Sequence, residues 1–187
     1  MIAGAALLLL LQSAAPAPER VMLDSLKAAC GRAGDLEAMK ADAVAAGWVP
    51  MAEDAEPRIA RINKLGRDAI GELGKATGAN YRRTVGGRDV FLILSRYDDN
   101  SGFWGAGCRV YDFDATAPFD PEALEAWMGK PPTGVEAPAP GLSRRLWEPA
   151  WRDGITFEAS HVPEGSPMGE QFGVRGNILV AQSIGGF

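Results

Sequence analysis

The spacing of apolar residues changes once along the chain, and this change predicts the fold class. Residues 19–29, 35–46 and 57–75 carry apolar side chains at three- and four-residue intervals, the period of amphipathic helices. The apolar stripe over 57–75 is predicted to be core. From residue 81 onward the apolar segments are short and bounded by glycine, proline or aspartate, which is typical of strands. Helices followed by strands favour an α+β fold, with N-terminal helices packed on a mainly antiparallel sheet.

Five strands and one further helix are predicted in the second part of the chain. Gly86-Gly87 separates two apolar segments and is typical of a hairpin turn. The proline-rich segment 130–141 and the segment 163–173 are predicted to be loops. We therefore expect residues 18–187 to form one domain whose sheet has about five strands. The predicted strands are 81–85, 88–96, 103–113, 155–161 and 177–184, and the further helix is 121–128.

The N-terminal segment indicates export. Residues 2–11 form an unbroken run of apolar and small residues, too short to cross a bilayer core of about 30 Å as a helix. Ala15 and Ala17 supply the small residues of a cleavage site, so residues 1–17 are predicted to be a signal peptide. We expect a periplasmic or secreted protein with no stable membrane span after signal removal. The alternative is a buried N-terminal helix, but the run has no polar face.

The chain has two cysteines, Cys30 and Cys108, and an exported protein with an even count usually pairs them. Cys30 belongs to the first helical segment and Cys108 to the strand 103–113. The alternation of that strand places Trp104, Ala106, Cys108 and Val110 on one face. A disulfide would therefore fasten the first helix over that face of the sheet. Two buried free thiols are the alternative.

The charge balance argues against nucleic acid as a partner. The chain has 24 acidic and 19 basic residues, for a formal net charge of −5. Such a protein lacks the basic surface whose release of counterions dominates binding to DNA or RNA.

Histidine is the residue that most limits the possible chemistry. His161 is the single histidine, so a multi-histidine metal site is excluded. It lies either at the end of a strand's core face, bonded to the backbone or a loop, or it is the base of a Ser-His-Asp or Ser-His-Glu set with Ser160, Ser166 or Asp153. No Gly-x-Ser-x-Gly elbow accompanies the second hypothesis.

Other motifs that would indicate a cofactor fail on context. Gly105-Ala106-Gly107 lies inside a predicted strand and opens no helix, so we interpret it as space for a helix to approach the sheet. The segment 98–102 has the composition of a turn. The sequence therefore predicts no metal, no cofactor and no catalytic residue.

Three tryptophans, Trp127, Trp147 and Trp151, flank the proline-rich segment. They belong either to the core, which we favour, or to a groove that binds a partner. Together with His161 they are the candidate binding residues. The surface predicted to contact a partner is the segment 130–149.

Several short motifs resemble small exported proteins of unknown function from alphaproteobacteria. They are Ala29-Cys30, Gly34-Asp35-Leu36, Gly47-Trp48 and Gly107-Cys108-Arg109-Val110, after an apolar N-terminal segment. The resemblance implies the compartment and the disulfide, and it implies no reaction.

Three functional hypotheses follow from the sequence. The favoured one is a non-enzymatic periplasmic binding or interaction domain whose partner is an envelope protein or a small ligand. The second is a small periplasmic hydrolase that uses His161. The third is an inhibitor of an envelope enzyme that presents the proline- and tryptophan-rich segment.

Overall fold

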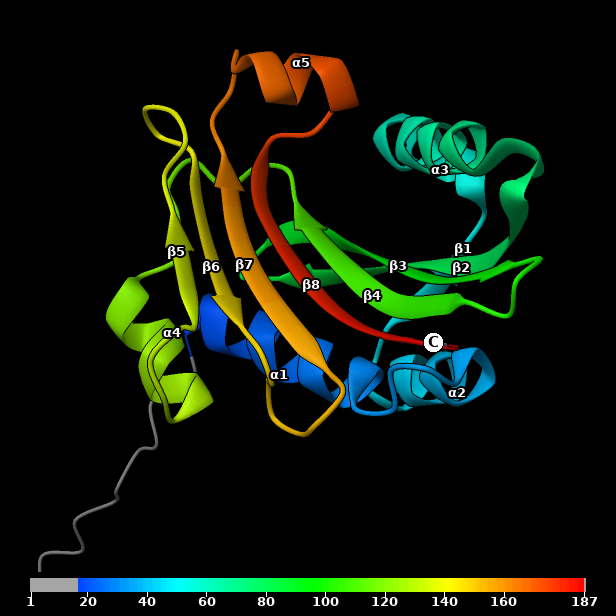
Figure 1. Ribbon diagram of the computed structural model, residues 1–187. Helices are drawn as coiled ribbons and strands as arrows, with labels where there is room; N and C mark the ends of the chain where they lie inside the picture. The colour runs from blue at the N-terminus through cyan, green and yellow to red at the C-terminus, as the bar shows by residue number, and fades with distance from the viewer. Residues whose placement is uncertain (1–16, 187) are drawn as a thin grey trace, which may run out of the picture.

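The computed structural model describes residues 17–186, so the predicted signal peptide lies outside the described residues except for Ala17. The described chain forms one antiparallel sheet of eight strands with five α-helices (Figure 1). The strand order is β1-β2-β3-β4-β8-β7-β6-β5. The helices are α1 (Pro18–Cys30), α2 (Leu36–Ala45), α3 (Pro57–Ile70), α4 (Pro121–Met128) and α5 (Pro167–Phe172). The strands are β1 (Val49–Met51), β2 (Gly74–Val85), β3 (Arg88–Asp99), β4 (Trp104–Asp112), β5 (Gly134–Glu136), β6 (Ser143–Trp147), β7 (Thr156–Val162) and β8 (Gly176–Gly185).

The helices begin where the sequence supplies caps. The Asp35 carboxylate accepts a hydrogen bond from the backbone N–H of Ala38 at 3.0 Å, at the start of α2. Asp120 accepts one from the N–H of Glu122 at 3.0 Å, and Pro121 fits the first turn of α4. The predictions of α1, α2 and α4 are confirmed. No helix within residues 17–186 has the length and apolar character needed to span a bilayer.

The α+β class and the antiparallel sheet are confirmed, but the prediction of about five strands is wrong. The three additional strands, β1, β5 and β6, lie toward the two ends of the strand order and have three to five residues each. Segments this short have no recognisable alternation, and they form strands because a neighbouring strand supplies hydrogen-bond partners.

Three segment boundaries also differ from prediction. The helix predicted over residues 57–75 ends at Ile70, because Gly71 adopts a positive φ of 52°. β2 then begins at Gly74 rather than at residue 81. The predicted loop 163–173 contains α5, which is capped by the Ser166 hydroxyl.

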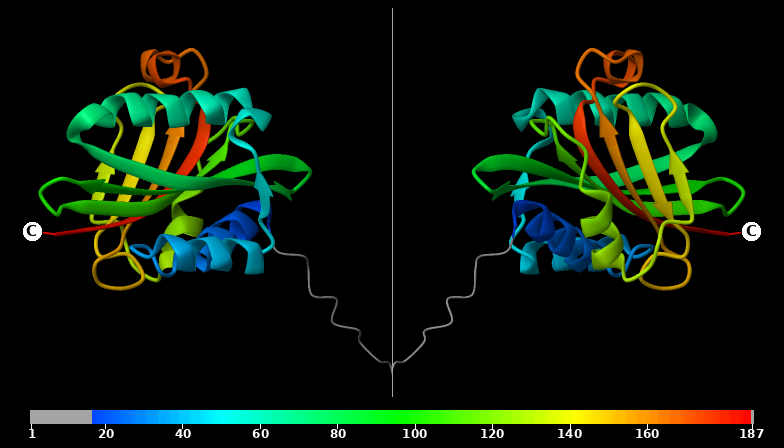
Figure 2. Two further views of the ribbon diagram at one scale, coloured as in Figure 1. Left: turned by 90° about the vertical axis from the view of Figure 1, so that its right-hand side faces the viewer. Right: turned by 90° about the vertical axis from the view of Figure 1, so that its left-hand side faces the viewer.

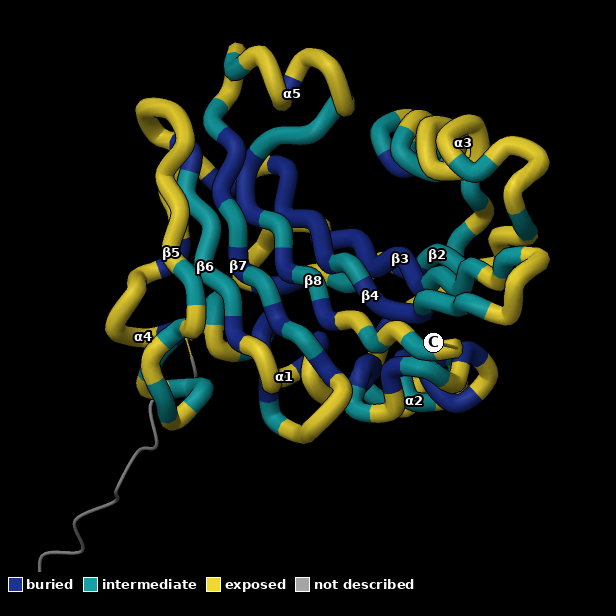
Figure 3. Tube along the Cα trace, viewed as in Figure 1, coloured by how far each residue is buried: buried dark blue, intermediate teal, exposed yellow. Residues whose placement is uncertain are grey.

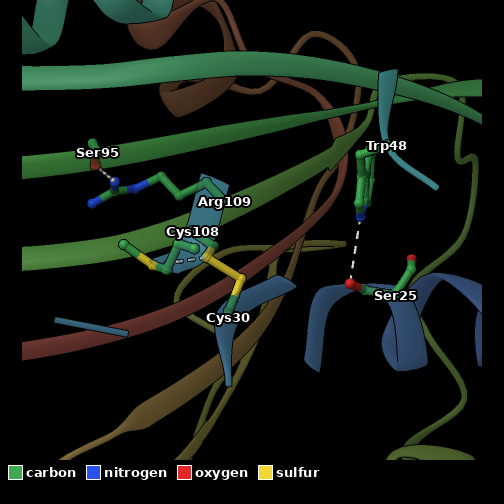
Figure 4. The surroundings of a disulfide bond; sticks show 7 residues. Ser25, Cys30, Trp48, Ser95, Cys108 and Arg109 are labelled. Carbon is green, nitrogen blue, oxygen red and sulfur yellow. Dashed lines mark hydrogen bonds between the residues drawn. A yellow bond between two sulfur atoms is a disulfide. The ribbon is translucent and has the colours of Figure 1, made fainter. Parts of the chain in front are cut away.

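One face of the sheet carries the larger core. α1, α2 and α4 lie on this face, and α3 lies on the opposite face (Figure 2). Alternate residues of the central strands point into the larger core, and they are buried together with the apolar stripe of α1 (Figure 3). Trp48, 2% exposed, lies in this core and donates its indole N–H to the Ser25 carbonyl at 3.4 Å (Figure 4).

The predicted disulfide is present. Cys30 at the end of α1 is bonded to Cys108 in β4, with their Cα atoms 6.0 Å apart (Figure 4). Both cysteines are fully buried. The bond fastens α1 to the face of β4 that the alternation predicted.

Candidate functional site

A cavity of about 470 Å³ lies between α3 and the face of the sheet opposite the disulfide. Its volume is within the range of roughly 300–1,000 Å³ typical of small-molecule sites. α3, β2, β3, β4 and β8 supply its walls, and we call it the α3 cavity. Its lining includes Ile62, Ile70, Ile93, Arg109, Tyr111 and Ile184.

Glycines on the strands create this space. A Cβ atom at Gly78 would lie 2.4 Å from the Leu94 carbonyl oxygen, and one at Gly107 would lie 2.5 Å from that of Ala181. Both positions therefore require glycine, and no side chain rises from them to fill the space under α3. Gly105 differs, because its added Cβ would meet Ile184 Cγ2 at an ordinary 3.5 Å. The sequence predicts that Gly105 and Gly107 let a helix pack closely on the sheet. In the structure both glycines line the α3 cavity instead.

The apolar stripe of α3 is mostly unburied. The sequence predicted that the whole stripe is core, but within α3 Ile59 alone is buried. It packs against Phe91, Ile93, Tyr111 and Phe113 in a second, smaller cluster. Leu65 is 36% exposed, and Ile62 and Ile70 are half-buried at the cavity. The prediction of a filled core along α3 is therefore wrong beyond its first turn, because the sheet offers glycines there.

Polar contacts hold the remainder of α3 in place, and two of them involve residues that line the cavity. Asn63 Nδ2 donates to Asn80 Oδ1 of β2 at 3.0 Å. Arg67 donates two hydrogen bonds to Glu53, at 2.9 and 2.7 Å, and these lower the pKa of that carboxyl. Asn63 thus ties the middle of α3 to β2, and Arg67 ties the C-terminal half of the helix to Glu53, in the segment that precedes it.

Arg109 lies in the cavity, and within residues 17–186 its side chain makes one hydrogen bond. It is half-buried, and its Nη1 donates to Ser95 Oγ of β3 at 3.0 Å. Figure 4 shows this pair on the opposite side of β4 from the disulfide. Tyr111, two residues on, is 4% exposed, and burial raises the pKa of its hydroxyl, so it stays protonated at neutral pH.

Neither Arg109 nor the cavity was predicted from the sequence. A signal existed in the alternation of β4: if Cys108 faces the larger core, Gly105, Gly107, Arg109 and Tyr111 share the other face. Two glycines beside a charged residue on one face of a central strand indicate an unfilled polar site.

His161 lies on the buried face of β7, as the first hypothesis expects, but its side-chain partner belongs to the neighbouring strand β8 and is neither backbone nor loop. It is 5% exposed, and its Nδ1 is 2.8 Å from Asn177 Oδ1. The Asn177 amide group in turn donates to the Ala117 carbonyl at 3.1 Å. The hollow beside His161 measures about 10 Å³, room for one water at most. This environment gives the hydrolase hypothesis no support.

The three tryptophans form one aromatic cluster around Phe157. The ring centroids of Trp127, Trp147 and Trp151 lie 5.3, 5.4 and 5.9 Å from that of Phe157. Trp147 is fully buried, and the other two are half-buried against the larger core. The Lys27 ammonium group lies 5.5 and 5.7 Å from the Trp127 and Trp151 ring centroids. The cluster joins α1 and α4 to β7 and is remote from Arg109, on the other face of the sheet.

The carboxylates of the turn 98–102 are engaged in hydrogen bonds within the protein. The Asp99 carboxylate accepts hydrogen bonds from the backbone N–H groups of Ser101 and Phe103, at 2.7 and 2.9 Å. Within residues 17–186, no three His, Cys, Asp or Glu side chains are grouped as metal ligands.

No protein-family model matches the sequence, and the comparisons with curated proteins and with solved structures give no significant match.

Proposed function

We propose that this protein is an exported, non-enzymatic domain that binds a small ligand in the α3 cavity. The observation that carries the proposal is the unfilled space under α3. A helix with an apolar stripe gains stability by burying it, yet Ile62 and Ile70 border an open volume of about 470 Å³. A ligand with an apolar body would bury this surface.

Two features support export. The segment 2–11 has the size and composition of a signal-peptide core. The Cys30–Cys108 bond is typical of proteins that fold in an oxidising compartment. We infer that the periplasm is the compartment and that the ligand is encountered there.

The test uses a neutral dye and a variant that fills the cavity. N-phenyl-1-naphthylamine fluoresces strongly in apolar surroundings and carries no charge, so its binding does not depend on an ion pair with Arg109. Gly105→Phe places a ring in the cavity from a position whose Cβ meets only Ile184 Cγ2, at 3.5 Å. The matched control is Gly134→Phe in β5, whose Cβ would meet Leu146 Cβ at 3.7 Å and which does not line the cavity.

We expect the wild type and Gly134→Phe to bind the dye with the same dissociation constant. Gly105→Phe should weaken binding by about tenfold or more, because the ring occupies the site. Circular dichroism and thermal melting establish that both variants are folded. Wild-type protein that binds no dye, or equal binding by both variants, would overturn the proposal.

A further inference from the structure

The charged residues that line the α3 cavity are Glu53, Arg67, Arg96 and Arg109. Glu53 and Arg67 neutralise each other through two hydrogen bonds. They therefore add no net charge to the site.

Arg96 directs its guanidinium away from the cavity. It bonds the Asp98 carboxylate and donates to the Gly34 carbonyl at 2.8 Å. Its guanidinium lies 4.9 Å from the ring centroid of Trp104, which packs against the larger core. Its charge is thus paired on the face that carries the disulfide.

Arg109 is the remaining cation. Among residues 17–186 no carboxylate lies within 4.0 Å of its guanidinium, whose one side-chain hydrogen bond goes to the neutral Ser95 hydroxyl. A guanidinium has five N–H donors in a planar fork. A half-buried arginine has lost part of its hydration, and this costs free energy unless an anion compensates it.

Part of the wall around Arg109 is apolar, beside polar residues such as Asn63, Asn80 and Gln182. Ile62 and Ile70 of α3 and Ile93 and Ile184 of the sheet line the same cavity. Ile184 is 54% exposed, so apolar surface extends to the open side. The site therefore combines one positive charge that no carboxylate pairs with a patch of four isoleucines in a wall that is otherwise partly polar.

We propose that the ligand of the α3 cavity is an amphipathic monocarboxylate, bound through Arg109 with its apolar body under α3. This inference rests on the proposed function and names the ligand class. The planar guanidinium matches a carboxylate with two parallel hydrogen bonds. A single cation balances one negative charge, so the site favours a carboxylate over a phosphate dianion.

The experiment compares octanoate with octan-1-ol, which share their chain and differ in the charged group. Isothermal titration calorimetry measures both ligands on the wild type, Arg109→Gln and Arg109→Lys. Arg82→Gln is the matched control, because Arg82 is an exposed arginine of β2 that does not line the cavity. The dye titration is repeated on every variant.

The wild type should bind octanoate about tenfold or more tightly than octan-1-ol. Arg109→Gln should weaken octanoate binding by about tenfold to a hundredfold, because it removes a charge-assisted hydrogen bond, and should leave octan-1-ol and the dye within about twofold. Arg109→Lys should fall between, since it keeps the charge and loses the fork. Arg82→Gln should match the wild type.

Two results separate the proposals. In the first, the dye binds and Gly105→Phe blocks it, but octanoate binds no more tightly than octan-1-ol, or Arg109→Gln weakens octanoate and octan-1-ol alike. The carboxylate assignment is then wrong, and the proposed binding of a ligand in the cavity stands. If the dye fails to bind, or Gly105→Phe does not affect it, the cavity function is itself wrong.

Discussion

Cys108 and Arg109 are consecutive residues of β4, and they point to opposite faces of the sheet (Figure 4). Cys108 is bonded to Cys30 of α1 in the larger core, and Arg109 extends into the α3 cavity. Cys108 and Arg109 both belong to β4, so the disulfide restrains the strand that positions Arg109. The alternation of a strand accounts for this division between the two faces.

Export predicts a defined processed form. When the full chain is expressed in a Gram-negative host, intact mass spectrometry of the periplasmic fraction should find a species cleaved near Ala17. It should be two hydrogens lighter than the reduced form and inert to thiol alkylation, because Cys30 and Cys108 are bonded. A full-length cytosolic species with two reactive thiols would contradict export.

Loss of the disulfide should destabilise the fold. The bond closes a loop of 78 residues, and the loop-entropy model gives a stabilisation of about 4 kcal/mol, with measured values for such bonds of about 2–4 kcal/mol. The double variant Cys30→Ala/Cys108→Ala should lose that much free energy of unfolding in urea titrations. Wild type reduced with a thiol is the control and should show a similar loss. Unchanged stability in both would show that packing alone holds α1 on β4.

Alanine substitutions at two glycines of β4 should have different effects. Gly107→Ala forces a Cβ to within 2.5 Å of the Ala181 carbonyl oxygen, and overpacking of this kind costs about 1–3 kcal/mol. Gly105→Ala places its Cβ at 3.5 Å from Ile184 and should change the free energy of unfolding by less than about 0.5 kcal/mol. Thermal or urea unfolding of the two variants measures the difference. Equal effects would contradict the tight strand contact at Gly107.

The stability of the fold should depend on the protonation of Asp112. Its side chain is 1% exposed, and burial raises the pKa of this carboxyl above its ordinary 3.8, while the Arg88 guanidinium at 2.7 Å opposes part of that rise. Above pH 3.8 the Asp112 carboxyl keeps its proton in the folded state and releases it in the unfolded state. Raising the pH from 3.8 through the folded pKa therefore costs stability.

The measurement compares the wild type with Asp112→Asn in urea titrations between pH 4 and 8. The stability of the wild type relative to the variant should fall as the pH rises. Arg88→Gln should steepen this fall, because it removes the cation that opposes the pKa rise. A difference that is constant with pH would show that Asp112 does not titrate in this range.

The sequence alone determined the elements whose stabilising contacts are local. Asp35 and Asp120 cap the helices that follow them, and the Gly86-Gly87 pair turns β2 into β3 with positive φ values of 59° and 81°. The alternation along β4, which places Trp104, Ala106, Cys108 and Val110 on one face, determined which face of the strand meets α1. These features could be predicted because their cause lies within a few residues of chain.

The tertiary structure alone decided the additional strands and the cavity. β5 lies within the proline-rich segment 130–141, which was predicted to be a loop, and it becomes a strand because β6 pairs with it, from Gly134 opposite Leu146 to Glu136 opposite Arg144. The helical period of the apolar residues in α3 predicts that they are buried. That period carries no information about the residues of the facing strands, which are glycines at several positions. Whether a side chain meets a partner or a void depends on residues far apart in the chain, here α3 and Gly105 and Gly107 of β4. Arg109 became a candidate site only when the fold placed it under a helix whose apolar stripe the sheet leaves uncovered.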